Sequence, residues 1–130
     1  MRKNEAFLAF RRAIEEGEVA DFLSLVSEDF YFTVPLPLAE WKGEQRGTRR
    51  FEELIRFERE HLAVRLTPVI ELEDDRCGIV VFRAEGTLDG APYGNELAIL
   101  FEFEKDRIRS FREYVGSTQY MADNKGKSVS

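Results

Sequence analysis

The first half of the chain carries apolar residues at helical spacing, and the second half alternates apolar with polar residues. Phe7, Phe10 and Ile14 recur three and four residues apart, which predicts an amphipathic helix. Asn4 precedes this run as a capping residue, and Gly17 follows it where helices commonly end. We therefore expect a helix between Asn4 and Gly17 that buries one face.

Two more helices are predicted before the alternating region begins. One is short, over residues 19–26, and the other begins at a Thr48 cap. Between them, residues 30–34 alternate as a strand, and the proline-bounded segment 35–46 is expected to be a loop. The apolar face of the last helix also carries Glu58, an acid in a position expected to face the core.

Four strands in consecutive hairpins are predicted after the third helix. Two-residue turns at Asp89-Gly90 and Lys105-Asp106 separate the last three strands. Pro68 lies within the first strand, which indicates a sheet edge or a bulge, because proline cannot donate to a ladder. The predicted strands cover residues 64–72, 78–88, 93–104 and 107–115.

This order of elements predicts an α+β fold in which three N-terminal helices pack on one side of a curved, mainly antiparallel sheet. Long hairpin strands curl, and a curled sheet backed by helices encloses a pocket. We expect one domain over residues 1–117. Residues 118–130 are expected to be a mobile tail, because they have few apolar groups to bury.

Composition and charge exclude several kinds of binding partner and site. The chain has 130 residues, a net charge of −6 and no cluster of Lys and Arg, so no nucleic-acid partner is expected. No apolar run is long enough for a membrane helix, and the charged N-terminus lacks the apolar core of a signal peptide, so a cytoplasmic protein without a membrane partner is expected. Cys77 is the single cysteine and His61 the single histidine, so neither a disulfide nor a metal site is expected. No nucleotide-binding glycine motif is present, and no cofactor is expected.

The same elements carry short motifs that resemble a known family. Gly17-Glu18 ends the first helix, Ser27-Glu28-Asp29 precedes the first strand, and PYGNELAILFEF follows the Asp89-Gly90 turn. With the closing segment RIRSFREY, this ordered set resembles the SnoaL-like and ketosteroid-isomerase-like proteins of the NTF2-like superfamily over about residues 5–116. The resemblance implies an NTF2-like cone, a small-molecule ligand within it and a homodimer.

The resemblance does not extend to the catalytic groups of the isomerases. Those enzymes use a strand Asp as base, with a helix Tyr and a second strand Asp at the oxyanion hole. The matching positions here are Val34, Phe10 and Ile99. A valine cannot abstract a proton, so these three residues are expected to contact a ligand only as hydrocarbon.

Glu113 and Asn95 are the polar exceptions on an otherwise apolar inward face, to which alternation also assigns Phe82, Phe111 and, at the pocket mouth, Tyr93. Burial favours the neutral form of a carboxyl group and raises its pKa, so Glu113 is the expected general acid or base. Its alternatives are pairing with an arginine, or a place at the sheet rim or an interface. Asn95 is expected to orient a ligand oxygen or, alternatively, to bond local backbone. Tyr93 contacts the ligand or packs near the turn.

Two further residues are candidates for the pocket. Glu58 either projects beside Glu113 as a carboxylate pair or reaches the rim and pairs with an arginine. Trp41 lies in a proline-bounded loop, where it either covers the pocket or forms a surface or partner contact. His61 is expected to have a structural place at a helix end.

Three functions are compatible with these residues. The first is a cyclase or isomerase type of enzyme that acts without a cofactor on a largely apolar, oxygenated small molecule. In it, Glu113 moves the proton and Asn95 holds an oxygen. The second is a binding module without chemistry, which the missing isomerase groups favour. The third is a dimeric scaffold that uses the outer face of the sheet.

Overall fold

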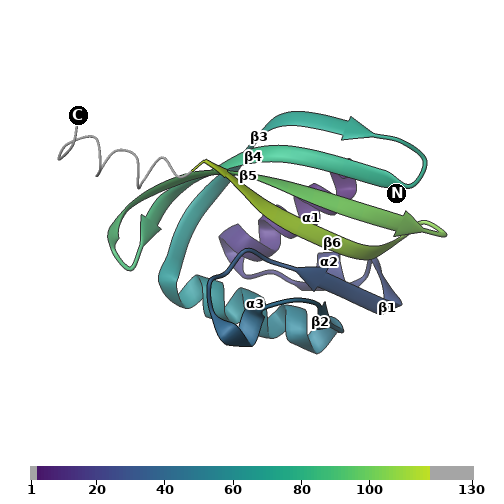
Figure 1. Cartoon of the computed structure of the whole chain (residues 1–130), viewed down its shortest axis with the longest axis horizontal. Helices are drawn as coiled ribbons and strands as arrows, with labels where there is room; N and C mark the ends of the chain where they lie inside the picture. Colours follow the sequence, from purple (N-terminus) through teal and green to yellow (C-terminus); the bar gives the residue numbers. More distant parts are fainter. Residues whose placement is uncertain (1–2, 118–130) are drawn as a thin grey trace.

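The computed structural model of the chain describes residues 3–117 and contains one six-stranded sheet (Figure 1). The helices are α1 (Lys3–Glu16), α2 (Ala20–Leu23) and α3 (Thr48–His61), with a 3-10 turn η1 (Ala39–Trp41). The strands are β1 (Val26–Thr33), β2 (Gln45–Arg46), β3 (Leu62–Glu73), β4 (Cys77–Leu88), β5 (Ala91–Glu104) and β6 (Arg107–Ser117).

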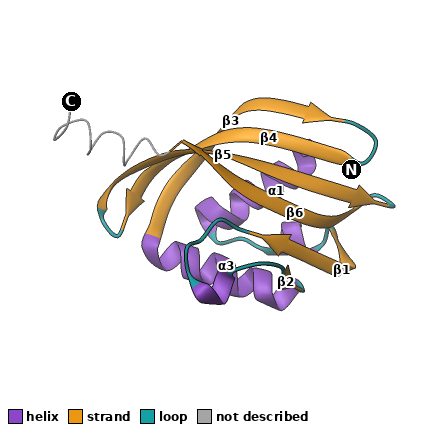
Figure 2. Cartoon of the chain, viewed as in Figure 1, coloured by secondary structure: helices purple, strands orange, loops and turns teal. Residues whose placement is uncertain are grey.

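The strands lie in the order β2-β1-β6-β5-β4-β3. Every neighbouring pair is antiparallel except β1 and β6, which are parallel. The helices pack on one side of the curved sheet (Figure 2), and the predicted α+β fold is confirmed. The consecutive hairpins β3–β4–β5–β6 account for the antiparallel part, because each strand pairs with the next one in the chain.

Two tight turns set the register of the long hairpins. Asp89 and Gly90 have φ values of 50° and 85°, and Lys105 and Asp106 have φ values of 52° and 62°. Positive φ at both central residues matches the twist of the flanking strands in a two-residue hairpin. These turns fix which residues of β4, β5 and β6 point to the helices, since a shift of one residue would reverse every side chain.

Aromatic side chains fill the space between the helices and the β1–β6 end of the sheet. Phe111 of β6 is fully buried among them, with its ring centroid 5.1 Å from that of Phe32 and 5.5 Å from that of Phe10. The rings of Phe22 and Phe51 stack at 4.6 Å. Buried ring pairs of this kind stabilise a core beyond the area that they remove from water.

A bulge divides the edge strand β3 into two parts that face opposite ways. Before it, Leu66 and Pro68 pair with Ala84 and Phe82 of β4, which point to the helices. After it, Ile70 pairs with Val81, which lies on the opposite face of β4. Pro68 was predicted to mark an edge or a bulge, and it stands at both, because β3 is the last strand of the sheet.

Side chains of the helices bond the backbone of their neighbours. The carboxylate of Glu15 on α1 accepts a hydrogen bond of 2.7 Å from the backbone N–H of Leu66 on the free side of β3. The guanidinium of Arg59 on α3 donates to the carbonyl of Ile14 at 3.0 Å. These bonds hold α1 against both β3 and α3, which border the cavity described below.

Several local predictions need correction. Helix α1 begins at Lys3, so Asn4 lies within it, and α2 ends at Leu23 rather than Val26. Gly47, not Thr48, occupies the N-cap position of α3, with a φ of 92°. The segment 35–46 contains η1 and the short strand β2, because Gln45 pairs with Phe32. The tail over residues 118–130, predicted to be mobile, lies outside the described residues.

Candidate functional site

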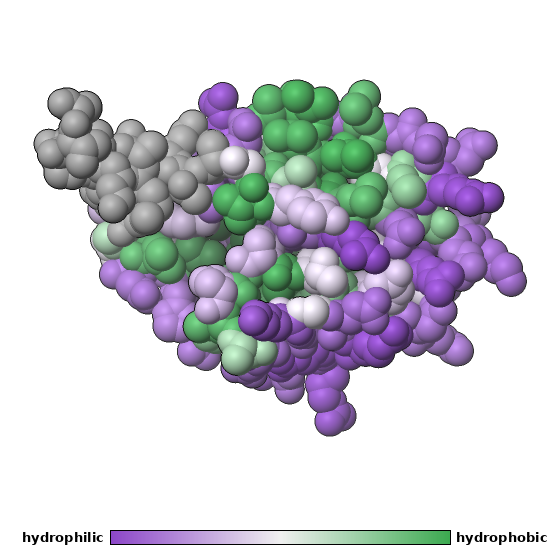
Figure 3. All heavy atoms as spheres, viewed as in Figure 1, coloured by the Kyte–Doolittle hydropathy of each residue, from purple (hydrophilic) through white to green (hydrophobic). Residues whose placement is uncertain are grey.

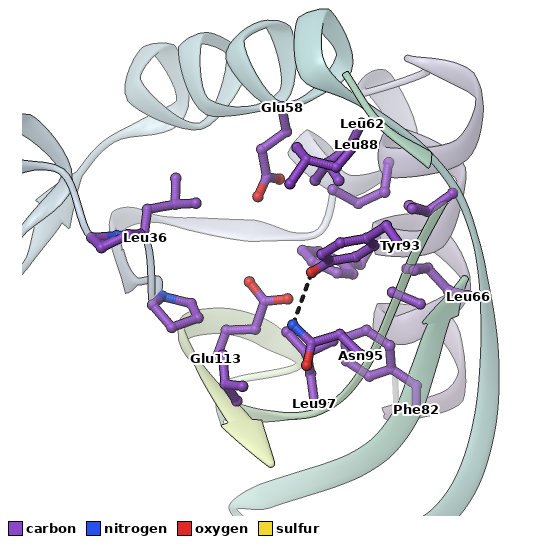
Figure 4. Close-up of a pocket in the computed structure, with 17 residues that line it drawn as sticks. Leu36, Glu58, Leu62, Leu66, Phe82, Leu88, Tyr93, Asn95, Leu97 and Glu113 are labelled. Carbon is purple, nitrogen blue, oxygen red and sulfur yellow. Dashed lines mark hydrogen bonds between the residues drawn. The ribbon is translucent and has the colours of Figure 1, made fainter. Parts of the chain in front are cut away.

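A cavity of about 330 Å³ lies between α1, α3 and the inner face of the sheet (Figure 4). Within residues 3–117, its lining is apolar except for two glutamates, one asparagine and one tyrosine. The lining residues are Phe10, Ile14, Pro35, Leu36, Pro37, Glu58, Leu62, Val64, Leu66, Phe82, Ala84, Leu88, Tyr93, Asn95, Leu97, Glu113 and Val115.

Strand register brings the polar groups to one side of this cavity. Asn95 of β5 pairs with Ala84 of β4, and Glu113 of β6 pairs with Ile99 of β5, so these side chains share the inner face. Glu58 follows Leu54 by four residues on α3, and Leu54 is fully buried, so helical periodicity turns Glu58 inward as well. The sheet and the helix thus present their acids to the same space.

The carboxyl groups of Glu58 and Glu113 extend into the cavity from opposite elements, as Figure 4 shows. Burial raises the pKa of Glu58 from 4.5 to about 7. Burial and the neighbouring charge of Glu58 raise the pKa of Glu113 well above 4.5. Neither side chain forms a hydrogen bond or an ion pair with another residue between 3 and 117. The pair therefore holds protons near neutral pH that surface glutamates release.

Asn95 and Tyr93 form a second polar group in the cavity. The amide Nδ2 of Asn95 donates to the hydroxyl of Tyr93 at 2.8 Å. The other amide atom of Asn95, Oδ1, is buried and has no hydrogen-bond partner among the described residues. Burial, as the largest cause, raises the pKa of Tyr93, and the charges of Glu113 and Glu58 raise it further. The hydroxyl thus stays protonated beside the two acids.

Six of the residues that the sequence assigned to the pocket line this cavity: Phe10, Glu58, Phe82, Tyr93, Asn95 and Glu113. Of the alternatives for the acids, pairing with arginine does not occur in the described part of the chain, and the carboxylate pair of Glu58 and Glu113 does. Their roles toward a ligand stay proposals.

The other four residues assigned to the pocket lie elsewhere. Phe111 and Ile99 are fully buried in the aromatic core, because they lie on the parts of β6 and β5 that the helices cover, next to the parts that line the cavity. Val34 is half-buried and packs against the same core. Trp41 packs inward on Phe57 with its ring centroid 3.6 Å from the guanidinium carbon of Arg50, so it does not cover the cavity.

Sequence reasoning missed the contribution of β3 and of the loop before η1. Leu62, Val64 and Leu66 alternate along β3 and line the cavity, and Leu36 lines it from the loop with its two flanking prolines. The alternation in residues 62–66 was visible in the sequence. No local pattern placed the predicted loop beside the cavity, since its position depends on tertiary packing.

The comparisons with known proteins agree with this architecture. A model of the SnoaL-like domain matches residues 7–111 of the chain. The chain belongs to the SnoaL-like family. The resemblance inferred from the sequence motifs is therefore confirmed. A comparison with curated proteins gave no match.

Solved structures show how widely this fold is shared. An NTF2-like protein from Anabaena variabilis is similar, with 30% identity, a TM-score of 0.78, and coverage of 88% of this chain and 86% of that one. A candidate polyketide cyclase from Pseudomonas putida has 19% identity and a TM-score of 0.71, covering 89% and 92% of the two chains. An LEH-like epoxide hydrolase from M. tuberculosis has 16% identity and a TM-score of 0.67, covering 85% and 80%. The last two show the fold of this SnoaL-like protein, and nothing about its chemistry.

Two features of other site classes are absent from residues 3–117. No group of three His, Cys, Asp or Glu side chains is arranged to hold a metal ion. No helix in this range is both long and apolar enough to cross a membrane.

Proposed function

We propose that this SnoaL-like protein binds a small, largely apolar and oxygenated molecule in the cavity and moves a proton on it without a cofactor. The observation that carries the proposal is the pair of carboxyl groups, Glu58 and Glu113, in an otherwise mostly apolar cavity. Two acids whose titrations are coupled, one protonated and one ionised, can supply a donor and an acceptor at the same pH. That combination serves isomerisation and ring closure, in which a proton leaves one ligand atom and returns to another.

Each polar group has a role in this proposal. Glu58, with a pKa of about 7, accepts a proton from the ligand in its ionised form, and Glu113, whose pKa is raised by burial and by the charge of Glu58, donates one near neutral pH. Asn95 and the hydroxyl of Tyr93 bind a ligand oxygen, since they lie together at 2.8 Å on the same side of the cavity. The apolar lining excludes water, which strengthens every one of these interactions.

Substitution of the acids tests the proposal. Native mass spectrometry of protein purified from its own host identifies a co-purifying small molecule, and its conversion is then followed by liquid chromatography. Glu113→Gln is expected to lower the turnover at least about a hundredfold, as loss of a general acid or base commonly does. Glu60→Gln, on the outer side of the same helix as Glu58, is the matched control. Undiminished turnover by Glu113→Gln would show that Glu113 does not move the proton.

A second candidate function is that of a dimeric, non-catalytic binding or scaffold module, and the outer face of the sheet favours it. The bulge in β3 places Ile70 and Leu72 on that face, where they pair with Val81 and Ile79. Ile70, Leu72 and Ile79 are 50%, 62% and 37% exposed. Apolar side chains gather over β3 and β4 in Figure 3. Exposed apolar patches of this kind mark interaction surfaces.

We propose that a second copy of the chain covers this face. Arg83 and Glu96 border it on adjacent strands, so two copies related by a twofold axis could align charges of opposite sign. Sedimentation velocity at micromolar concentration is expected to show a dimer for the wild type and a monomer for Ile79→Lys. A wild-type monomer would refute this pairing. A stable dimer that holds its ligand unchanged would favour the module over the enzyme.

A further inference from the structure

We propose that the cavity selects a ligand whose apolar body carries a protonated amine. The proposal rests on the proposed function, because it names the charge of the ligand for the same cavity. It concerns what the cavity binds, not what reaction follows, so equilibrium measurements can test it separately.

The charges around the cavity are of one sign only. Glu58 and Glu113 line it, and no Lys, Arg or His among residues 3–117 does. The chain has 19 Lys and Arg residues, and some of them pair with acids on the surface: Arg12 lies 3.7 Å from Glu16 and Arg50 lies 2.7 Å from Glu53. The two acids of the cavity thus combine a place in a mostly apolar lining with the absence of a basic partner in the described chain.

A neutral ligand would leave the negative charge of the Glu58 and Glu113 pair without a partner. When Glu58 and Glu113 share one proton, the pair still carries one negative charge in a mostly apolar cavity, and a buried charge without a counter-ion is costly. A ligand ammonium group would neutralise the charge and donate hydrogen bonds to both carboxylates, which face the same space in Figure 4. An anionic ligand would add to the repulsion.

The remaining polar groups also leave acceptors in excess. One N–H of the Asn95 amide donates to the hydroxyl of Tyr93, and the Oδ1 acceptor of Asn95 has no partner among the described residues. An ammonium group only donates, so it complements a site that is rich in acceptors. The rings of Phe10, Phe82 and Tyr93 line the same cavity and offer surface to the apolar body of such a ligand. A volume of about 330 Å³ is at the small end of the range for ligand pockets.

A bound cation would also set the protonation state of the pair. The titratable groups that face the cavity are Glu58 from α3, Tyr93 from β5 and Glu113 from β6, while α1, β3 and β4 contribute apolar residues. A positive charge favours the ionised carboxylates, so binding near pH 6.5 releases protons and affinity rises as the pH increases through about 7. The ligand itself would thus favour the ionised, basic form of the pair.

Three probes of nearly equal size test the charge preference by isothermal titration calorimetry at pH 8. They are cyclohexylmethylammonium, cyclohexylmethanol and cyclohexanecarboxylate. The ammonium is expected to bind at least about tenfold more tightly than the alcohol, and the carboxylate not measurably. In Glu58→Gln/Glu113→Gln the advantage of the ammonium over the alcohol is expected to disappear, and in Glu60→Gln it is expected to stay. If the double variant does not fold, the advantage of the ammonium over the alcohol is measured in Glu58→Gln and in Glu113→Gln separately.

The possible outcomes separate the charge preference from the proposed function. Equal binding of ammonium and alcohol would overturn the charge preference while the cavity remains a ligand site. Failure of all three probes to bind would overturn both the charge preference and the proposed function. A preference for ammonium together with undiminished turnover by Glu113→Gln would support the preference and refute the acid–base role. Proton release, measured at pH 6.5 in buffers of different ionisation enthalpy, should accompany ammonium binding and not alcohol binding.

Discussion

Glu58 should make the protein less stable at pH 8 than at pH 5. Its pKa is about 7 in the folded chain, against an ordinary value of 4.5. Between these two values the folded state binds more protons than the unfolded state, so the free energy of unfolding falls as the pH rises. The stabilising effect of the bound proton is complete below about pH 4.5 and is lost above about pH 7. Glu58→Gln removes the titrating group and keeps the shape of the side chain.

The size of the effect follows from the two pKa values. A difference of one pKa unit corresponds to 1.36 kcal/mol, so the interval from 4.5 to about 7 corresponds to about 3 kcal/mol. Part of this change is already complete at pH 5, and Glu58 is half-buried rather than fully enclosed. We therefore expect Glu58→Gln to gain about 2 kcal/mol over the wild type between pH 5 and pH 8.

Urea unfolding followed by circular dichroism measures this difference. Wild type and Glu58→Gln are compared at pH 5, 6, 7 and 8, and the difference between the two proteins isolates Glu58 together with its effect on Glu113, because the remaining groups titrate alike in both. Glu60→Gln, whose side chain lies outside the cavity, should follow the wild type at every pH. A Glu58→Gln advantage that stays constant from pH 5 to pH 8 would refute the reasoning, since it would mean that Glu58 is ionised throughout.

Three further substitutions test the packing around the cavity. Phe111→Ala should lower the free energy of unfolding by about 3–5 kcal/mol, because it empties the centre of the aromatic core; a loss below about 1 kcal/mol in urea unfolding would contradict that placement. Gly86→Ala should cost about 1–3 kcal/mol or more, because a Cβ there would lie 2.0 Å from the carbonyl oxygen of Ala63; an unchanged melting temperature would show that β3 does not approach so closely. Glu15→Ala should speed hydrogen exchange at the Leu66 amide, its partner at 2.7 Å, while Glu15→Gln keeps most of the protection; equal exchange rates in both variants and the wild type would count against the bond.

The elements that carry local signals could be predicted from the sequence. The Asp89-Gly90 and Lys105-Asp106 turns fixed the register of β4, β5 and β6, and with it the inward direction of Asn95 and Glu113. Alternation then gives the face of every residue on those strands. Helical periodicity likewise turned Glu58 inward, although it could not decide between the rim and the interior.

Depth along a strand could not be predicted in the same way. Phe111 and Glu113 share a face of β6, yet Phe111 is enclosed by Phe10 and Phe32 while Glu113 lines the cavity. The difference arises because the helices cover only part of the strand, and their position depends on contacts between distant segments. Trp41 shows the same limit, since its loop folds inward on Arg50 through a contact that no sequence pattern announces.

The bulge after Pro68 gives one strand two independent sets of side chains. Residues 62–68 of β3 belong to the cavity, and Ile70 and Leu72 belong to the outer face. If Val69 paired with Val81 instead of bulging out, Ile70 and Leu72 would turn toward the helices, so the extra residue keeps both of them on the outer face. Evolution can therefore alter the ligand specificity of one half of β3 and the self-association of the other half by separate mutations, without a trade-off between them.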